Sequence, residues 1–412
     1  MATHPPFIPG AGQGPQGVIQ PRQRRFTRTG IAIWWREIDR VLLVLVLALM
    51  ALGTLAVAAA SPASAQRLST ARVKLDDLHF FSIHLRWQLL GLMALIGASM
   101  LSRDMARRLA ILLGAAMLVG LFLVPLIGVN VNGAKRWLNL GMSLQPSEFL
   151  KPAFAICLAW ILSWRARDPN LPVMALSTGL MILIGALLML QPDFGSAVLF
   201  AGVWFAMVLV AGLPMQRLGG VIAAGLGAIT LVYLFYENGR NRIDAFLGGG
   251  TAFDQVDLAS KTLLAGGWTG TGIWLGRRKM ALPEAHTDYI FSVIGEEFGL
   301  LVCIAVVLLY VAIVLRVLLR LMKEEDLFTT LAAAGLAAQL GGQAFINILV
   351  NLQLFPSKGM TLPLVSYGGS STIALCLGVG LLLAITRRNP FLERNTFRIG
   401  DMGGGLTARK RS

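Results

Sequence analysis

Residues 283–288 (PEAHTD) place two carboxylates and an imidazole directly before an apolar run that begins at Tyr289. Asp288 stands where a helix is expected to begin, so its structural role alone would be that of an N-cap. The helix dipole would then hold the pKa of Asp288 down and keep the carboxylate ionised. An ionised carboxylate here can also act as a general base. His286 is expected to be a hydrogen-bonding structural residue, because only His79 accompanies it in the loops between apolar runs.

A second group of charged and aromatic residues precedes another apolar run. Arg136 and Trp137 are of the types found at headgroup depth, so interfacial anchoring is the simplest role for them. Ser147 is the predicted N-cap of the following helix. Glu148 then lies in the first turn, and Lys151, three residues on, lies on the same face. Because an unpaired charge within a membrane span costs roughly 2.5–3.5 kcal/mol, the two are expected to pair and to face the interior of the helix bundle.

Two glycine-containing segments are candidates for a tight turn and for free backbone N–H groups. Residues 191–195 (QPDFG) are most simply a tight turn between antiparallel helices. Residues 358–371 (KGMTLPLVSYGGSS) end in Gly-Gly-Ser-Ser, whose exposed N–H groups could bind a phosphate. A re-entrant, glycine-packed helix start is an equal alternative. The glycines of 237–288 do not form a GxGxxG sequence after a strand, which excludes a dinucleotide site.

The composition indicates which solvent surrounds the elements that position these residues. Of 412 residues, 56% are hydrophobic and 14% are charged, whereas soluble domains are about a quarter charged. Much of the chain is therefore expected to lie in lipid, which excludes a cytosolic nucleotide-binding enzyme. The three cysteines (Cys157, Cys303 and Cys376) lie within apolar runs and are expected to be free core residues, not a disulfide or metal site.

The fold class that follows is an all-α polytopic membrane protein with about ten transmembrane helices. A bilayer core of about 30 Å requires ~20 apolar residues in a helix. Ten runs approach this length: 41–61, 82–101, 109–128, 148–164, 171–190, 195–213, 217–236, 289–316, 327–350 and 369–386.

Charge predicts the orientation of these spans. The net charge is +15, and much of the excess lies in a basic tail at 1–40 and another at 387–412. Arginine also follows the second, fourth, sixth and eighth spans, so the positive-inside rule places both tails in the cytoplasm. The excess is therefore topological, and no nucleic-acid partner is expected. The membrane domain is 41–386, and its largest extracytoplasmic loop, 237–288, connects spans 7 and 8.

Five motifs together make the chain resemble the SEDS (shape, elongation, division and sporulation) family, over about residues 40 to 390. They are KRWLNLG, QPSEFLK, QPDFG, PEAHTDYIFSVIGEE and LPLVSYGGSS. The fourth and fifth are similar to the cell-division branch. The resemblance implies a peptidoglycan glycosyltransferase of the bacterial cytoplasmic (inner) membrane, acting at the division septum. It would polymerise lipid II into β-1,4 glycan strands.

The resemblance also implies roles for residues. Asp288 matches the family's essential aspartate and would take the proton of the acceptor hydroxyl. The implied substrate-binding residues are Arg136, Trp137, Glu148, Lys151, His286 and Ser366. Arg136 and Lys151 would offset charge on the departing pyrophosphate. Direct displacement would invert the anomeric centre.

The resemblance finally implies ligands and partners. They are lipid II, undecaprenyl-pyrophosphate-linked glycan, a class B penicillin-binding protein transpeptidase and other divisome proteins. A divalent cation, Mg²⁺ or Mn²⁺, could assist the pyrophosphate, although no ligand cluster in the sequence establishes a metal or another cofactor. Two alternatives remain: a lipid II flippase or other transporter, and a non-catalytic scaffold for division proteins.

Overall fold

The computed structural model describes residues 30–70, 73–131, 134–139, 141, 143–212, 215–248, 251–357 and 359–388. The chain divides into two units, Met1–Arg36 and Glu37–Ser412. Most of α1 (Gly30–Glu37) belongs to the first unit. Most of both predicted basic tails lies outside the described residues.

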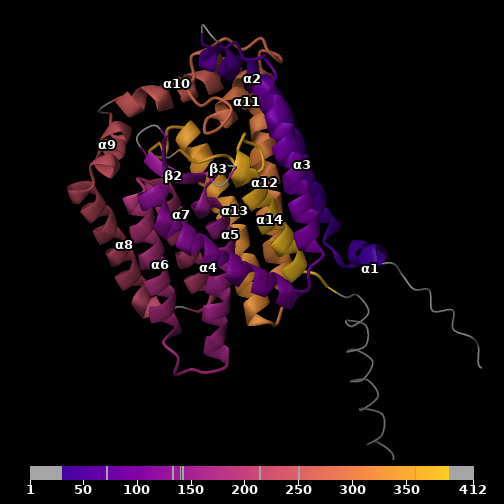
Figure 1. The fold of residues 1–412 in the computed structure, drawn as a ribbon, viewed down its shortest axis with the longest axis vertical. Coiled ribbons are helices and arrows are strands. Elements are labelled where there is room, and N and C mark those ends of the chain that lie inside the picture. Colours follow the sequence, from indigo (N-terminus) through magenta and orange to yellow (C-terminus); the bar gives the residue numbers. More distant parts are fainter. Residues whose placement is uncertain are drawn as a thin grey trace, which may run out of the picture. The chain divides into compact units, whose positions relative to one another are not determined.

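The second unit is a bundle of helices (Figure 1). Its helices are α2 (Arg40–Leu68), α3 (His79–Ser99), α4 (Arg103–Ile127), α5 (Pro146–Ser163), α6 (Val173–Leu190), α7 (Phe194–Val210), α8 (Met215–Phe235), α9 (Glu237–Phe246), α10 (Thr251–Ala265), α11 (Ile290–Phe298), α12 (Leu300–Leu321), α13 (Leu327–Asn351) and α14 (Gly369–Ile385), with 3-10 turns η1 (Trp164–Ala166) and η2 (Arg278–Met280). Side chains of Asp39, Ser102, Asp193 and Asp326 cap α2, α4, α7 and α13, which satisfies backbone N–H groups that the helices leave free.

The protein is a multi-pass membrane protein. Among the described residues, seven helices are long and apolar enough to cross a bilayer, and α8 with α9, bent by 101°, raises the number to eight. The apolar α7 and α14 are shorter, with 17 residues each. All ten predicted runs coincide with helices, but ten membrane crossings remain a prediction.

The predicted span 289–316 is wrong as one helix. The chain breaks at Gly299, between α11 and α12, with φ at +84°. A side chain there would meet the backbone of Trp268 and Gly270 at 2.4 Å, so glycine is required for the close approach. The segment 237–288, predicted only as a long loop, contains α9 and α10.

The bundle is all-α, as predicted, and the 129–144 segment outside it forms a small antiparallel sheet. Its strands are β1 (Val129–Val131), β2 (Ala134–Asn139) and β3 (Ser143–Leu144), in the order β1-β2-β3. The register pairs Asn130 with Lys135 and Leu138 with Leu144. This sheet presents Arg136 and Trp137 from a strand instead of a flexible loop.

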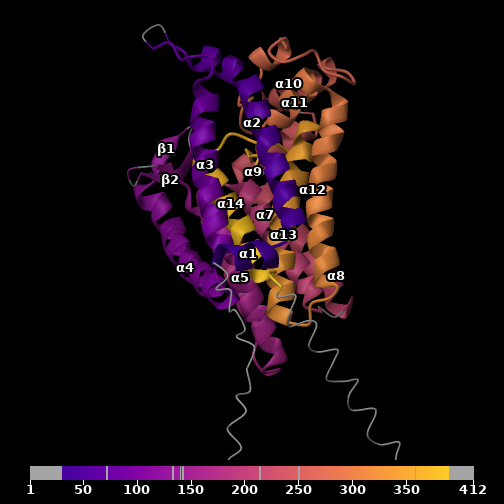
Figure 2. The ribbon, with the colours of Figure 1, turned by 90° about the vertical axis from the view of Figure 1, so that its right-hand side faces the viewer.

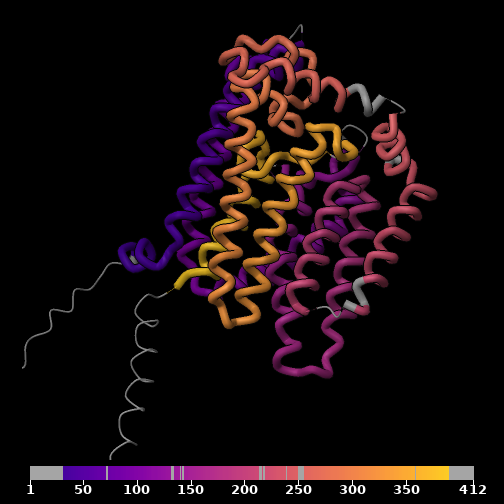
Figure 3. Tube along the Cα trace, turned by 180° about the vertical axis from the view of Figure 1, so that it is seen from behind, coloured from indigo at the N-terminus to yellow at the C-terminus, as the bar shows by residue number. Residues whose placement is uncertain are grey.

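The bundle interior is built from close helix pairs. Helix α14 packs along α3, and α5 packs along both α4 and α13 (Figure 2). Seen from behind, α12 and α13 run side by side (Figure 3). Small residues allow such approach: a side chain at Gly380 on α14 would meet the carbonyl oxygen of Leu95 on α3 at 2.5 Å.

Candidate active site

A cavity of about 680 Å³ lies where β2, α5, α7, α9 and the segments before α11 and α14 meet. Four of the predicted site residues line it: Arg136, Trp137, Glu148 and Asp288. Its walls also include Asp193, Arg242, Gln255, Glu284, Thr287, Tyr367 and the 368–371 backbone. Elements distant in sequence therefore converge on one polar chamber.

Asp288 is not the N-cap that the sequence predicted. Tyr289 occupies that position, and no side chain caps α11. Burial and the neighbouring charge of Glu284 raise the pKa of Asp288 to about 7, although Arg136 and Arg242 oppose the rise. The prediction of a low pKa is therefore wrong. Within the described residues the Asp288 carboxylate accepts no hydrogen bond, so it is free to accept a proton from a ligand.

A stripe of carboxamides on α13 holds the backbone around Asp288. Gln343, Asn347 and Asn351 recur every fourth residue, so they share one helix face, and all three are buried. Asn347 Nδ2 donates to the carbonyl oxygens of Asp288 at 2.8 Å and Met360 at 2.6 Å. Asn351 Nδ2 donates to the Asp288 carbonyl at 3.2 Å. One helix face thus fixes the position of the carboxylate.

The same stripe reaches the predicted ion pair on α5. Lys151 Nζ lies 2.7 Å from Glu148 Oε1, and both residues are buried, so the predicted pair and its inward orientation are confirmed. Lys151 Nζ also donates to Gln343 Oε1 at 3.4 Å. Glu148 Oε2 is buried and has no hydrogen-bond partner in the described part of the chain. Ser147 is not the N-cap: α5 begins at Pro146, and Gln145 precedes it without a side-chain cap.

Arg136 is anchored by the turn between α6 and α7. Its Nε donates to the Gln191 carbonyl at 3.3 Å, and its Nη2 donates to the Pro192 carbonyl. Gln191 is held in turn by a bond from Nε2 to the Leu121 carbonyl at 2.6 Å. The predicted tight turn at 191–195 is confirmed, and it positions a guanidinium at the cavity wall.

His286 lies behind the cavity wall and not on it. Its Nδ1 is 2.8 Å from Ser64 Oγ on α2, and its ring packs at 4.4 Å from Phe80 and 5.1 Å from Tyr367. Burial lowers the pKa of His286 to about 4, so the ring is neutral at neutral pH. Its predicted structural hydrogen bond is confirmed, and its substrate-binding role stays a prediction.

Ser366 and Lys151 are also absent from the cavity lining. Ser366 Oγ donates to the Thr287 carbonyl at 2.6 Å and accepts from Leu362 N at 2.8 Å. It therefore joins the segment before α14 to the one that carries Asp288. Both side chains contact protein groups in this structure, and their substrate-binding role stays a prediction.

Several lining residues received no site role from the sequence, among them the charged residues Arg242 and Glu284. Arg242 on α9 donates from Nη1 to the Ser357 carbonyl at 2.8 Å. Glu284 accepts from Thr287 Oγ1 at 2.7 Å. Their charge was visible in the sequence, but the direction in which α9 and the 284 turn would face depends on tertiary packing.

Among the described residues no group of three or more His, Cys, Asp or Glu side chains could hold a metal ion. A cation could still rest on one or two carboxylates together with substrate phosphates, as Mg²⁺ commonly does. Glu148 and Asp288 both line the cavity, and the unpartnered Glu148 oxygen fits such a ligand.

Fold and site define a multi-pass membrane protein in whose polar cavity a carboxylate of raised pKa shares the walls with two arginines. Residues 39–390 match the model of the FtsW, RodA and SpoVE cell cycle proteins, and the chain belongs to this family. It is 38% identical over 372 residues to a probable peptidoglycan glycosyltransferase FtsW of Caulobacter vibrioides, covering 89% of this chain and 93% of the relative. The corresponding FtsW of Thioalkalivibrio sulfidiphilus is 36% identical over 392 residues, covering 90% and 95%.

Solved structures share the fold. A chain in a structure described as the structural coordination of polymerization and crosslinking by a peptidoglycan synthase complex superposes with a TM-score of 0.71, at 30% identity over 85% of this chain and 98% of that one. The rod shape determining protein RodA of Thermus thermophilus gives a TM-score of 0.61 at 30% identity, over 85% of this chain and 97% of that one.

Proposed function

We propose that this SEDS-family peptidoglycan glycosyltransferase polymerises lipid II into β-1,4 glycan strands. The reaction takes place at the outer face of the bacterial cytoplasmic membrane, at the division septum. The observation that carries the proposal is Asp288, a carboxylate with a pKa of about 7 in a cavity that also presents Arg136 and Arg242. A general base works best when its pKa lies near the operating pH.

The reaction is an inverting displacement. Asp288 accepts the proton of the sugar 4-hydroxyl of incoming lipid II. The freed oxygen forms a bond to the anomeric carbon of the growing chain as the bond from that carbon to undecaprenyl pyrophosphate breaks. The raised pKa makes Asp288 a stronger base than the sequence suggested. No general acid is needed because pyrophosphate is a stable leaving group.

Other residues of the cavity wall would bind the sugar and phosphate groups and neutralise their charge. Arg136 and Arg242 offset the charge of the departing pyrophosphate. Trp137 offers an aromatic face for a sugar ring, and the backbone at 368–371 offers N–H groups to a phosphate. A divalent cation held by Glu148 and the substrate phosphates would supply further neutralisation of the pyrophosphate.

The orientation supports this use of the cavity. We place both tails in the cytoplasm and the cavity at the outer face, with ten crossings that include the short α7 and α14. A class B penicillin-binding protein is the proposed partner, and the related chain in a peptidoglycan synthase complex is consistent with such an assembly.

A flippase and a non-catalytic scaffold are the competing functions. Purified protein in vesicles is supplied with lipid II, with and without the transpeptidase partner, and glycan length is measured by gel electrophoresis. Glycan strands that require this protein are the expected product, in larger amount with the partner. Transfer of lipid II across the vesicle membrane without polymer in either condition would favour the flippase, and neither activity would favour the scaffold.

A further inference from the structure

The loop at 266–281, which connects α10 to the segment before α11, exposes large apolar side chains. Trp268 is 65% exposed and Leu275 is 68% exposed, and Ile273 and Trp274 are also largely exposed. Exposed apolar side chains gathered on a loop outside the helix bundle usually mark a surface that contacts another protein or a membrane.

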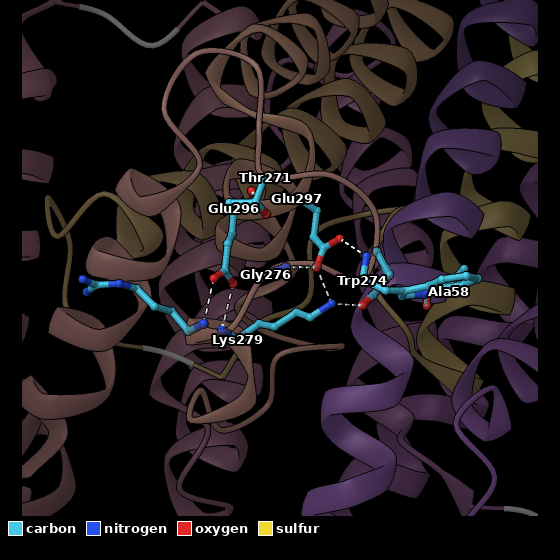
Figure 4. A network of polar contacts seen from close by, with 9 residues as sticks. Ala58, Thr271, Trp274, Gly276, Lys279, Glu296 and Glu297 are labelled. Atoms are coloured by element: carbon cyan, nitrogen blue, oxygen red, sulfur yellow. Dashed lines mark hydrogen bonds and ion pairs between the residues drawn. The ribbon is translucent and has the colours of Figure 1, made fainter.

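A buried ion pair holds this loop in one conformation (Figure 4). Lys279 Nζ pairs with Glu297 Oε1 on α11, and both side chains are almost completely buried. Glu297 also accepts from the backbone N–H groups of Trp274 and, at 3.3 Å, Gly276. The tip is therefore bound to α11 through its backbone, while the side chains of Ile273 and Leu275 stay exposed.

The neighbouring carboxylate fixes the rest of the loop (Figure 4). Glu296 accepts from Arg278 N at 2.7 Å and from Lys279 N at 2.8 Å. The Glu296 carbonyl accepts from Thr271 N at 2.8 Å. Because both carboxylates of α11 bind the loop, its exposed side chains form a surface with a fixed position.

Hydrogen bonds to α2 indicate how deep the loop lies relative to the predicted hydrocarbon core of the membrane. Arg67 Nη1, near the end of α2, donates to the Ala281 carbonyl at 3.0 Å. Trp274 Nε1 donates to the Ala58 carbonyl at 3.1 Å. At a rise of 1.5 Å per residue, Ala58 lies about 13 Å further along α2 than Arg67, inside the apolar run 41–61. The loop tip thus reaches the level at which the predicted hydrocarbon core begins.

The apolar tip continues the lipid-facing surface of two spans. Leu301, in the first turn of α12, donates from its backbone N to the Trp268 carbonyl at 3.2 Å and is 55% exposed. Leu55, one turn from the loop's contact on α2, is also exposed. Arg277 and Arg278 follow the tip directly and are exposed. Tryptophan beside arginine is typical of the membrane–water interface.

We propose that the 266–281 loop binds the outer leaflet of the membrane. Ile273 and Leu275 enter the edge of the hydrocarbon region, and the tryptophan rings lie at headgroup depth. Arg277 and Arg278 contact anionic lipid phosphates. The loop packs on α11, which directly follows Asp288, so lipid binding would anchor the segment that carries the general base.

Spin labels test this placement independently of catalysis. A cysteine-free background, made by replacing Cys157, Cys303 and Cys376 with alanine, receives Leu275→Cys or Ile273→Cys. Lys261→Cys, on the exposed face of α10, is the matched control. Each labelled protein is reconstituted without a partner into phosphatidylcholine–phosphatidylglycerol vesicles. Collision rates with oxygen, which partitions into lipid, and with a water-soluble nickel chelate are then measured.

The proposal predicts an oxygen-to-nickel collision ratio several-fold higher at positions 275 and 273 than at 261. Ratios at both positions equal to the control would overturn it, because the tip would then lie in water. Shielding of both labels from both reagents would also overturn it, because the tip would then be covered by a second protein molecule.

Discussion

At the scale of the residue, the pKa of Asp288 decides when the proposed base is active. Its value of about 7 is raised first by burial and next by the charge of Glu284. Below this pH the carboxyl group is protonated and cannot accept a proton, so kcat/KM for polymerisation should fall as the pH drops from about 8 to about 6. A pH–rate profile of purified protein checks this. A rate that stays level over that interval would contradict the assignment.

The pKa of Asp288 also predicts how a substitution at Glu284 shifts the pH–rate profile. Glu284→Gln removes a negative charge that destabilises ionised Asp288. The pKa of Asp288 should therefore fall, and the acid limb of the pH–rate profile should move to lower pH. Asp257→Asn on α10, where the side chain is 33% exposed and pairs with Lys261, is the control and should leave the limb in place.

The Glu148–Lys151 pair is the second prediction at this scale. Removing either partner leaves a buried charge uncompensated, at a cost of roughly 3–5 kcal/mol. Glu148→Ala combined with Lys151→Ala should therefore destabilise less than the sum of the two single changes. Thermal unfolding in detergent measures this coupling. Additive losses would mean that the contact of 2.7 Å contributes nothing.

These residues also show where sequence reasoning ends. The Glu148–Lys151 pair follows from spacing on one helix face, so it could be predicted. The pKa of Asp288 could not, because it depends on burial and on Arg242, which approaches from a different helix. His286 and Ser366 lie in the right motifs, but their side chains turn toward protein partners, and sequence does not reveal that direction.

Among the helices, α13 positions the backbone of Asp288. Asn347→Leu keeps the side-chain size but removes the hydrogen bonds to the carbonyl oxygens of Asp288 and Met360, which leaves the Asp288 carbonyl with only the longer bond from Asn351. A displacement of the base by about 1 Å can cost ~100-fold in rate. The expected result is a large fall in kcat with little change in KM, and Asn347→Gln should restore part of it.

The control for this variant lies on the same helix. Gln339→Leu replaces a buried carboxamide one turn before Gln343 and should leave kcat nearly unchanged. Equal losses in the two variants, measured as initial rates of lipid II polymerisation, would indicate general destabilisation of α13 and not positioning of the base.

The helices themselves were largely predictable. Apolar runs mark them in the sequence, whereas the two predicted N-caps, Ser147 and Asp288, were wrong. The break at Gly299 was not, because a glycine in an apolar run does not show which backbone will approach it. In the structure the backbone of the 266–281 loop lies too close for a side chain at that position.

For the molecule as a whole, the proposed function requires an outward cavity and cytoplasmic tails. Single cysteines at Lys261 and at Arg167, in the connection between α5 and α6, should react differently with a membrane-impermeant maleimide. In intact spheroplasts, Lys261→Cys should be labelled and Arg167→Cys should be labelled only after permeabilisation. The reverse pattern would place the cavity on the cytoplasmic side.

We propose that Asp288 is the general base of a glycan polymerase. Asp288→Asn keeps the size of the side chain but cannot accept the proton. Lipid II polymerisation by this variant with its transpeptidase partner is the most direct test, with Asp257→Asn as control. A loss of ~100- to 10,000-fold is expected in a protein that still folds and binds its partner, whereas the control keeps its activity. Polymerisation by Asp288→Asn at near the wild-type rate would contradict the account.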